Sequence, residues 1–313
     1  MFSNAILIYN TESGQSKKGR LLEPIKAHFE DQGIPLKIVK IPLKGEDIVE
    51  TLEKTSLDGA DLCIAAGGDG TVSLIGSKLI NTNVPLGILP LGTGNLLAQE
   101  LNIPINLEKA LVLITADQPS VVSIDAIQMG ERCSINNVSV GVIPKVMKET
   151  PAAEKQRLGL FAYLIHFINQ FLGLRLNRFF LEYDHQHLSF LASEVLITNG
   201  QSVGVHQLKW SEKIAINDGY LDLFIIRAKC VRDFFALLYS IIAKRKRDDI
   251  VKYIRFSDYC RIETPNPIPV QADGDTFGET PLEIKVLSRV LSVIVGENLD
   301  DNLISKGVNY EKI

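Results

Sequence analysis

Residues 61–71 read Asp-Leu-Cys-Ile-Ala-Ala-Gly-Gly-Asp-Gly-Thr. The apolar run 62–66 ends in a glycine turn, and a helical pattern follows over residues 72–80. Strand, glycine turn and helix in this order are typical of a parallel α/β sheet, where ligands bind at the carboxyl ends of the strands. We therefore predict a buried strand, a binding turn and a helix in this stretch.

A second glycine turn follows a second apolar run. Residues 85–90 read Pro-Leu-Gly-Ile-Leu-Pro and precede Gly92-Thr93-Gly94. Apolar runs at 5–9 and 36–41, with a helical pattern over 17–32 and another after 41, continue the alternation towards the N-terminus. Because the carboxyl ends of parallel strands meet at one edge of the sheet, we expect the two glycine turns to face one site.

The pattern changes after residue 118, from alternating strands and helices to strand-like segments separated by turns. The predicted strands are 179–183, 188–197, 220–227, 259–263, 282–287 and 290–295, and the predicted helices are 155–173 and 231–246. A chain of 313 residues also exceeds the usual size of a single core. We predict an α/β domain over 1–118 and a mainly antiparallel β domain over 119–313, whose final segment closes the sheet or returns to the first domain.

Composition excludes several classes of protein. A net charge of -4 with 46% hydrophobic residues indicates a folded protein without the basic field that attracts nucleic acid. The four cysteines have no paired spacing, which argues against a zinc site or a disulfide framework. The N-terminus has no signal-peptide pattern. We expect a soluble, cytoplasmic protein.

The first glycine turn has a composition that suits phosphate. Its backbone amides and the following helix end can receive phosphate oxygens, and the glycines permit close approach. Asp69 would repel phosphate unless a cation such as Mg lay between them. A tight turn with a capping Asp is the alternative. The dinucleotide fingerprint is excluded, because Leu97 stands where it requires Gly or Ala, and the sequence has no Walker motif.

Seven segments together resemble the diacylglycerol kinase catalytic family, which is related to sphingosine kinases and NAD kinases. In the family's order they are 10–14, 67–71, 89–95, 137–141, 199–200, 217–222 and 273–275. The resemblance covers nearly the whole chain. It implies an NAD kinase/diacylglycerol kinase-like fold of two domains, with an N-terminal nucleotide-binding domain, a C-terminal lipid-substrate domain, and ATP and Mg in the cleft between them.

The resemblance also implies the residues that contact ATP and Mg. The ATP contacts would be Asn10, Ser13, Gly14, Gly67, Gly68, Asp69, Gly70, Thr71, Gly92, Thr93 and Asn95. A second-domain Mg would be held, partly through backbone carbonyls, at Ala215, Asp218 and Tyr220. The alternative for residues 217–219 is a hairpin turn, which Asp-Gly favours without a metal.

Three acidic residues are the candidates for catalysis. The family's base lies in an Asp-Gly-Glu segment, and this chain has Asp273-Gly274-Asp275 there. By this resemblance Asp275 would accept the proton of the substrate hydroxyl, with Asp273 as its oriented neighbour or a metal partner. Asp69 would act beside the phosphates. For an isolated Asp-Gly-Asp, a solvated turn is the simpler interpretation.

Several positions depart from the family pattern. Ser73-Leu74 replaces an Asn-Glu pair, Leu96 replaces an Asp, and Ile41 stands where bacterial members often carry Thr. Residues 203–205 read Val-Gly-Val where a glycine triplet is usual. These changes alter residues that are expected to make polar contacts with the nucleotide and the acceptor. Reduced activity would be consistent with them.

The resemblance implies an Mg-dependent lipid kinase that transfers the γ-phosphate of ATP to a lipid hydroxyl, with diacylglycerol giving phosphatidic acid as the first expectation. An NAD kinase and a non-catalytic lipid or nucleotide sensor are the alternatives. A membrane surface is the expected partner, through apolar helical patterns at 161–172 or 234–243, the second followed by Lys244-Arg245-Lys246-Arg247. Core packing and a solvated helix end are the alternatives for these stretches, and a homodimer stays open.

Overall fold

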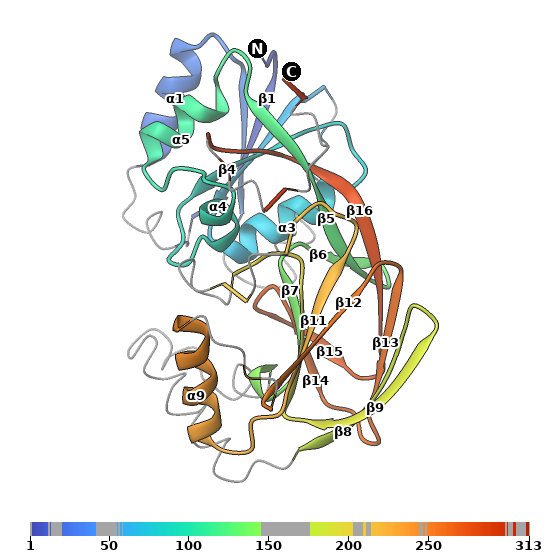
Figure 1. Cartoon of the computed structure of the whole chain (residues 1–313). Helices are drawn as coiled ribbons and strands as arrows, with labels where there is room; N and C mark the ends of the chain where they lie inside the picture. The colour runs from blue at the N-terminus through green and yellow to red at the C-terminus, as the bar shows by residue number, and fades with distance from the viewer. Residues whose placement is uncertain are drawn as a thin grey trace. The chain divides into compact units, whose positions relative to one another are not determined.

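The fold was analysed in a computed structural model, which describes residues 2–11, 13, 21–41, 55, 57, 59–144, 176–202, 209–210, 214–243, 247, 249–297, 299, 303–304 and 311–312. Gly14, the predicted helix 155–173 and Lys244 to Lys246 lie outside the described residues. The chain divides into two compact units. The first comprises Met1–Ala126, Gly200–Asp218 and Leu287–Ile313, and the second comprises Ile127–Asn199 and Gly219–Val286. Figure 1 labels most of their helices and strands.

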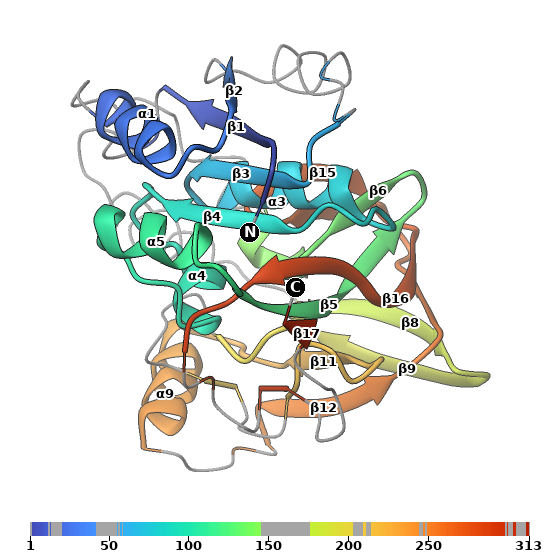
Figure 2. The same ribbon diagram turned by 90° about the horizontal axis from the view of Figure 1, so that it is seen from above.

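A parallel sheet forms the centre of the first unit. Its strands are β1 (Ala5–Asn10), β2 (Leu36–Ile41), β3 (Leu62–Gly67) and β4 (Leu86–Pro90), in the order β2-β1-β3-β4. Figure 2 shows β1, β3 and β4 side by side. The last part of β16 (Leu282–Ile294) joins β4 in parallel, with Val293 opposite Leu86. Every residue of β1 and β3 is buried, as in a sheet covered on both faces.

Four described helices accompany this sheet. They are α1 (Leu22–Asp31), α3 (Asp69–Leu79), α4 (Leu96–Glu100) and α5 (Leu107–Ile114). The helix α3 buries Val72, Ile75 and Leu79, which lie on one face at helical spacing. It begins at Asp69, three residues before the predicted start, so residues 69–71 form its first turn rather than a loop before it.

The second unit consists mainly of antiparallel strands. One sheet has the order β12-β11-β10-β7-β14-β15, and β16 pairs with β13, β13 with β8, and β8 with β9. The bounds are β7 (Asn137–Gly141), β8 (Asn177–Tyr183), β9 (Gln186–Ala192), β10 (Glu194–Thr198), β11 (Leu221–Ile226), β12 (Val251–Phe256), β13 (Tyr259–Glu263), β14 (Pro269–Ala272) and β15 (Asp275–Glu279). The second unit also contains β6 (Arg132–Ser134) and α9 (Val231–Ile242), whereas β17 (Glu311–Lys312) and most of β5 (Ser120–Met129) belong to the first unit.

Buried side chains of these strands form the core of the second unit. Val138 and Val140 of β7 pack in one buried cluster with Phe179 of β8 and Ile262 of β13. Alternating burial in β13 follows from one face packing on this core. The α/β first unit and the antiparallel second unit confirm the predicted fold class.

Two predicted strand boundaries were wrong. Residues 188–197 divide into β9 and β10 at Ser193, whose backbone N–H and hydroxyl both donate to the carbonyl of Ile226. Residues 282–287 and 290–294 belong to the single strand β16, which continues through Arg289 at φ 54° and ends one residue before the predicted end. Within the described part of the chain, no helix is long and apolar enough to cross a bilayer.

Candidate active site

The two glycine turns of the first unit lie against each other. The backbone N–H of Leu91 donates to the carbonyl of Gly67 at 2.9 Å. A Cβ atom on Gly92 would lie 2.5 Å from Cα of Gly68, closer than real Cβ contacts allow. Glycine at position 92 is therefore required for this approach. The contact confirms the expectation that both turns meet at one edge of the sheet.

The side chain of Asn95 holds the second turn in shape. Its Oδ1 accepts from the backbone N–H of Gly92 at 2.9 Å, and its Nδ2 donates to the carbonyl of the same residue at 2.9 Å. Asn95 adopts φ 50°, a left-handed conformation that asparagine tolerates better than most residues. Thr93 is exposed at this braced turn, so its side chain is accessible to a ligand.

Asp69 connects the two turns. Its Oδ1 accepts from the backbone N–H of Leu96 at 2.5 Å, which joins the first turn of α3 to the first turn of α4. A Cβ atom on Gly94 would lie 2.7 Å from Oδ2 of Asp69, so a larger residue there would displace this carboxylate. The bond to position 96 uses the main chain. The replacement of the family's Asp by Leu96 therefore leaves this contact intact.

The first sequence segment meets the same loop. Asn10, at the end of β1, donates from Nδ2 to the hydroxyl of Thr71 at 2.8 Å, and both residues are buried. The hydroxyl of Ser13 donates to the carbonyl of Asn10 at 3.2 Å. Parallel pairing of β1 with β3, with Tyr9 opposite Ala66, brings these positions together. Segments 10–13, 67–71 and 91–96 thus form one connected cluster.

The N-terminus of α3 lies in this cluster. The residue before it, Gly68, is extended and provides no side-chain cap, and the eleven-residue helix begins directly at Asp69. The first backbone N–H groups of an α-helix lack partners within the helix and carry partial positive charge. Such an end, approached by glycine backbone, suits a phosphate group.

Glu100 was not among the predicted site residues. Its carboxylate accepts from the backbone N–H of Gln201, and a Cβ atom on Gly200 would lie 2.5 Å from Glu100 Oε2. Burial raises the pKa of Glu100 to about 6, against the opposing effects of the Gln201 amide and of Lys209. This residue fixes the segment 200–201 to the helix that follows the second glycine turn. An acid at the end of a short helix gave no signal in the sequence.

In the second unit, Asp273 is held by three backbone amides. Its Oδ2 accepts from Ile135 at 2.8 Å, and its Oδ1 accepts from Asn136 at 3.0 Å and Asn137 at 2.9 Å. The residue has φ 48°. These charge-assisted bonds join segment 273–275 to the start of β7. These bonds indicate that Asp273 holds segment 273–275 in position.

Asp275 occupies a different environment two residues later. It is exposed at the start of β15, after Gly274 at φ 91°. The backbone N–H of Gly274 donates to Oε1 of Gln271 at 2.7 Å, and Nε2 of Gln271 donates to Oδ1 of Asn137 at 3.0 Å. These hydrogen bonds hold the turn in place. Asp275 itself is exposed to solvent.

The segment 214–220 contains the predicted carbonyl ligands. In the first unit Ala215 is buried and Asp218 is half-buried, and the carbonyl of Asn217 accepts from Nε of Arg289 at 3.0 Å. In the second unit Tyr220 is exposed, and the guanidinium of Arg255 lies 4.3 Å from the centre of its ring. The described residues include no cluster of three or more His, Cys, Asp or Glu side chains able to hold a metal.

Besides Leu96 in α4, the described positions that depart from the family pattern lie in α3 and β2 of the first unit, and residues 203–205 lie outside the described residues. Ser73 is buried and Leu74 half-buried in α3. Ile41 is buried at the end of β2, where it pairs with Asn10. Positions 41 and 74 therefore carry apolar side chains.

Comparison with known proteins supports the kinase family that the seven sequence segments resemble. Residues 4–128 match the model of the diacylglycerol kinase catalytic domain, and residues 136–295 match that of the YegS C-terminal NAD kinase beta sandwich-like domain. The "Probable lipid kinase YegS" of Escherichia fergusonii is 30% identical over 92% of this chain and 94% of its own length. The "Probable lipid kinase YegS-like" of Citrobacter koseri is 29% identical over 93% and 95%.

Solved structures agree in fold. A crystal structure described as a diacylglycerol kinase from Bacillus anthracis str. Sterne superposes with a TM-score of 0.69, covers 96% of this chain and 99% of its own, and is 21% identical. At that identity the likeness establishes the fold alone.

The fold, the paired glycine turns and the matched domains together define a kinase with a diacylglycerol kinase catalytic domain. The chain belongs to the YegS-like family of lipid kinases.

Proposed function

We propose that the chain transfers the γ-phosphoryl group of Mg-ATP to the hydroxyl of a lipid, with diacylglycerol as acceptor and phosphatidic acid as product. The observation that carries the proposal is the contact between the glycine turns. Gly92 packs on Gly68, and Asp69 joins both turns through the amide of Leu96. This arrangement concentrates backbone N–H groups and one carboxylate at the end of a parallel sheet, which suits a polyphosphate and its cation.

The cluster in the first unit would bind ATP. The N-terminal turn of α3 and the glycine backbone would receive phosphate oxygens, and the exposed Thr93 would add a hydroxyl donor. Asn10 would act by holding Thr71, since its side-chain amide donates to the Thr71 hydroxyl. Gly14 keeps the role implied by the family resemblance.

The donor groups of this cluster fit a magnesium ion. Mg prefers oxygen ligands, and in kinases it is held by one or two carboxylates together with substrate phosphates. Asp69 supplies one half-buried carboxylate in the first turn of α3. When bound, Mg would neutralise charge that develops on the phosphoryl oxygens. A further Mg at Ala215, Asp218 and Tyr220 stays a prediction, tested by a rise in melting temperature with Mg in the absence of ATP.

We assign the base of the proposed reaction to Asp275. The acceptor hydroxyl would give its proton to this exposed carboxylate while its oxygen bonds to the γ-phosphorus and the bond to the departing ADP oxygen breaks. Asp273 would position the turn, because its two oxygens already accept from three backbone amides.

The alternatives are an NAD kinase, which would use the same type of glycine loop, and a sensor that binds without turnover. Leu74 and Leu96 were the main support for a sensor. Because Asp69 contacts the main chain of residue 96, the leucine side chain does not remove this part of the cluster.

The proposal is tested by following labelled γ-phosphate from ATP into a chloroform-extractable product, with diacylglycerol in detergent micelles. We expect transfer by the wild type, none without Mg, and a loss of at least about a hundredfold in Asp69→Asn. Label in NAD instead of lipid would replace the proposal by the NAD kinase alternative. ATP binding without transfer to any acceptor would replace it by the sensor.

A further inference from the structure

The strand β9 of the second unit lies at one end of a sheet. Within the described part of the chain the order β13-β8-β9 ends there, and β9 pairs with β8 alone. Asp184 and His185, at φ 42° and 64°, form the two-residue turn between these strands. Tyr183 and Gln186, which flank the turn, therefore form the first hydrogen-bonded pair of the hairpin.

Every second residue of β9 directs its main chain away from β8. Because hydrogen-bonded and non-hydrogen-bonded pairs alternate, Leu188 and Phe190 bond to β8, and the N–H and C=O groups of His187, Ser189 and Leu191 lie on the opposite edge. Among the residues that the structure describes, none pairs with this edge. The side chains at 187, 189 and 191 are also exposed. The edge thus offers donors and acceptors to a further strand.

The sequence of β9 lacks the features that usually keep sheet edges from pairing. Charged side chains, proline and bulges commonly serve this purpose. Residues 186–192 read Gln-His-Leu-Ser-Phe-Leu-Ala, without Asp, Glu, Lys, Arg, Pro or Gly. The strands at the other ends of the two described sheet paths do carry charges, namely Lys37 and Lys40 in β2, Lys252 and Arg255 in β12, and Asp275 and Glu279 in β15. The difference indicates that the edge of β9 is a pairing surface.

The residues of β9 complement a second, antiparallel β9 strand. With Ser189 opposite itself, Leu188 lies opposite Phe190 of the second copy, and His187 lies opposite Leu191. Phe190 belongs to the buried cluster of the second unit and Leu188 packs against it, so this alignment would continue an apolar layer. The main chains of residues 187, 189 and 191 would complete each other's hydrogen bonds. Since β9 has no Asp, Glu, Lys or Arg, two copies of it do not repel each other.

We propose that β9 is the contact surface of a homodimer, in which it pairs antiparallel with β9 of a second copy of the chain. The twofold axis passes at Ser189, and the sheet continues from one copy into the other. Such a contact uses the same surface of both copies and closes after two. This inference goes beyond the proposed function and does not depend on it, because the pairing requires neither ATP nor lipid.

Sedimentation velocity of the full chain, over a range of micromolar concentrations, tests the pairing. Ser189→Lys and Ser189→Glu are made separately, since this residue would lie opposite itself. The side chain of Ser189 is exposed, so both variants should keep the wild-type melting temperature, which circular dichroism measures. Each variant alone places like charges opposite each other, whereas an equimolar mixture of the two places opposite charges there.

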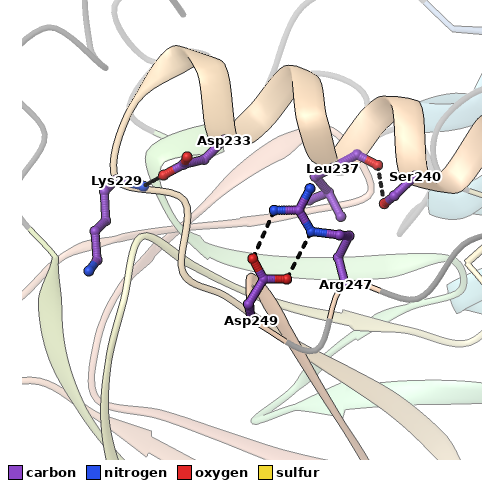
Figure 3. A network of polar contacts seen from close by, with 6 residues as sticks. All are labelled: Lys229, Asp233, Leu237, Ser240, Arg247 and Asp249. Carbon is purple, nitrogen blue, oxygen red and sulfur yellow. Dashed lines mark hydrogen bonds and ion pairs between the residues drawn. The ribbon is translucent and has the colours of Figure 1, made fainter.

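The control changes exposed apolar side chains elsewhere in the second unit. It is Phe235→Gln/Tyr239→Gln in α9, where these side chains are 49% and 62% exposed. The start of this helix is held by Asp233, which accepts from the backbone N–H of Lys229 at 2.9 Å, as Figure 3 shows. The substitutions leave that contact intact, so the control separates the edge of β9 from exposed apolar surface in general.

We expect a wild-type dimer, a dissociation constant at least about tenfold higher for each charge variant, and recovery of the dimer in their mixture. The α9 variant should dimerise as the wild type does. A wild type that is monomeric over the whole range would overturn the proposal, as would charge variants that dimerise like the wild type. A mixture that stays monomeric would overturn pairing centred on Ser189, and a monomeric α9 variant would assign the contact to α9 instead.

Discussion

Oδ1 of Asp69 accepts a hydrogen bond from the backbone N–H of Leu96 at 2.5 Å, so a side chain in the first glycine turn holds the helix that follows the second. The bond explains how the chain keeps the geometry of its site with leucine at position 96, because only the main chain of that residue takes part. It also gives Asp69 a structural role in addition to the proposed catalytic one.

The structural role of Asp69 can be separated from its charge. Asp69→Ala leaves the amide of Leu96 without its acceptor and should lower the free energy of unfolding by about 1–3 kcal/mol. Asp69→Asn keeps an oxygen at this place and should lower it by less than about 1 kcal/mol. Urea denaturation of both variants measures the difference. Equal stability of the two would show that the bond to Leu96 contributes little.

Gly92 is the position where an added methyl group should be most harmful. A Cβ there would lie 2.5 Å from Gly68 Cα, whereas a Cβ on Gly68 would lie 3.3 Å from Gly92 Cα. We expect Gly92→Ala to destabilise the fold by about 1–3 kcal/mol and weaken ATP binding, and Gly68→Ala to do less. Thermal melting and nucleotide titration give both quantities. Gly130→Asn is the control, since φ is 60° there, asparagine tolerates this conformation, and no atom lies within 4 Å of its Cβ. The reverse order of the two loop variants would contradict this packing.

Substitution of Asp273 should reduce stability, whereas substitution of Asp275 should reduce activity. Asp273→Ala removes the acceptor of three backbone amides and should cost at least about 3 kcal/mol of stability. Asp275→Asn, at an exposed position, should leave the melting temperature unchanged and reduce kcat with little change in KM for ATP. Melting curves and steady-state kinetics distinguish the roles. Normal kcat in Asp275→Asn would remove this residue from the proposed mechanism.

Glu100 should make stability depend on pH. Its folded-state pKa is about 6, above the ordinary value of 4.5, so folding favours the protonated form. This contribution is fully present below pH 4.5 and is lost as the pH rises through 6. Relative to Glu100→Gln, which cannot ionise, the wild type should lose about 2 kcal/mol between pH 4.5 and 7. Denaturation at several pH values measures it, with the exposed Glu131→Gln as control. A difference that stays constant with pH would contradict the raised pKa.

The sequence was informative where local pattern and tertiary structure agree. The consecutive apolar residues of β3 and β4 and the glycines after them predicted both strands and the meeting of their turns. Long-range contacts were beyond local patterns. Neither the amides of residues 135–137 at Asp273 nor the Gln201 amide at Glu100 has a signal within a short window of sequence. The sequence predicted separate strands at 282–287 and 290–295, but pairing with neighbouring strands carries β16 through the residues between them.

The most direct test of the central claim is transfer of labelled γ-phosphate from ATP to micellar diacylglycerol by the wild type, Asp69→Asn and Asp61→Asn. Asp61 also accepts backbone amides in the first unit, from Ser3 and Asn4, but lies outside the glycine turns. The account predicts labelled phosphatidic acid from the wild type and Asp61→Asn, dependent on Mg, and at least about a hundredfold less from Asp69→Asn. Equal transfer by all three proteins would contradict it, as would a folded wild type that binds ATP and labels no lipid.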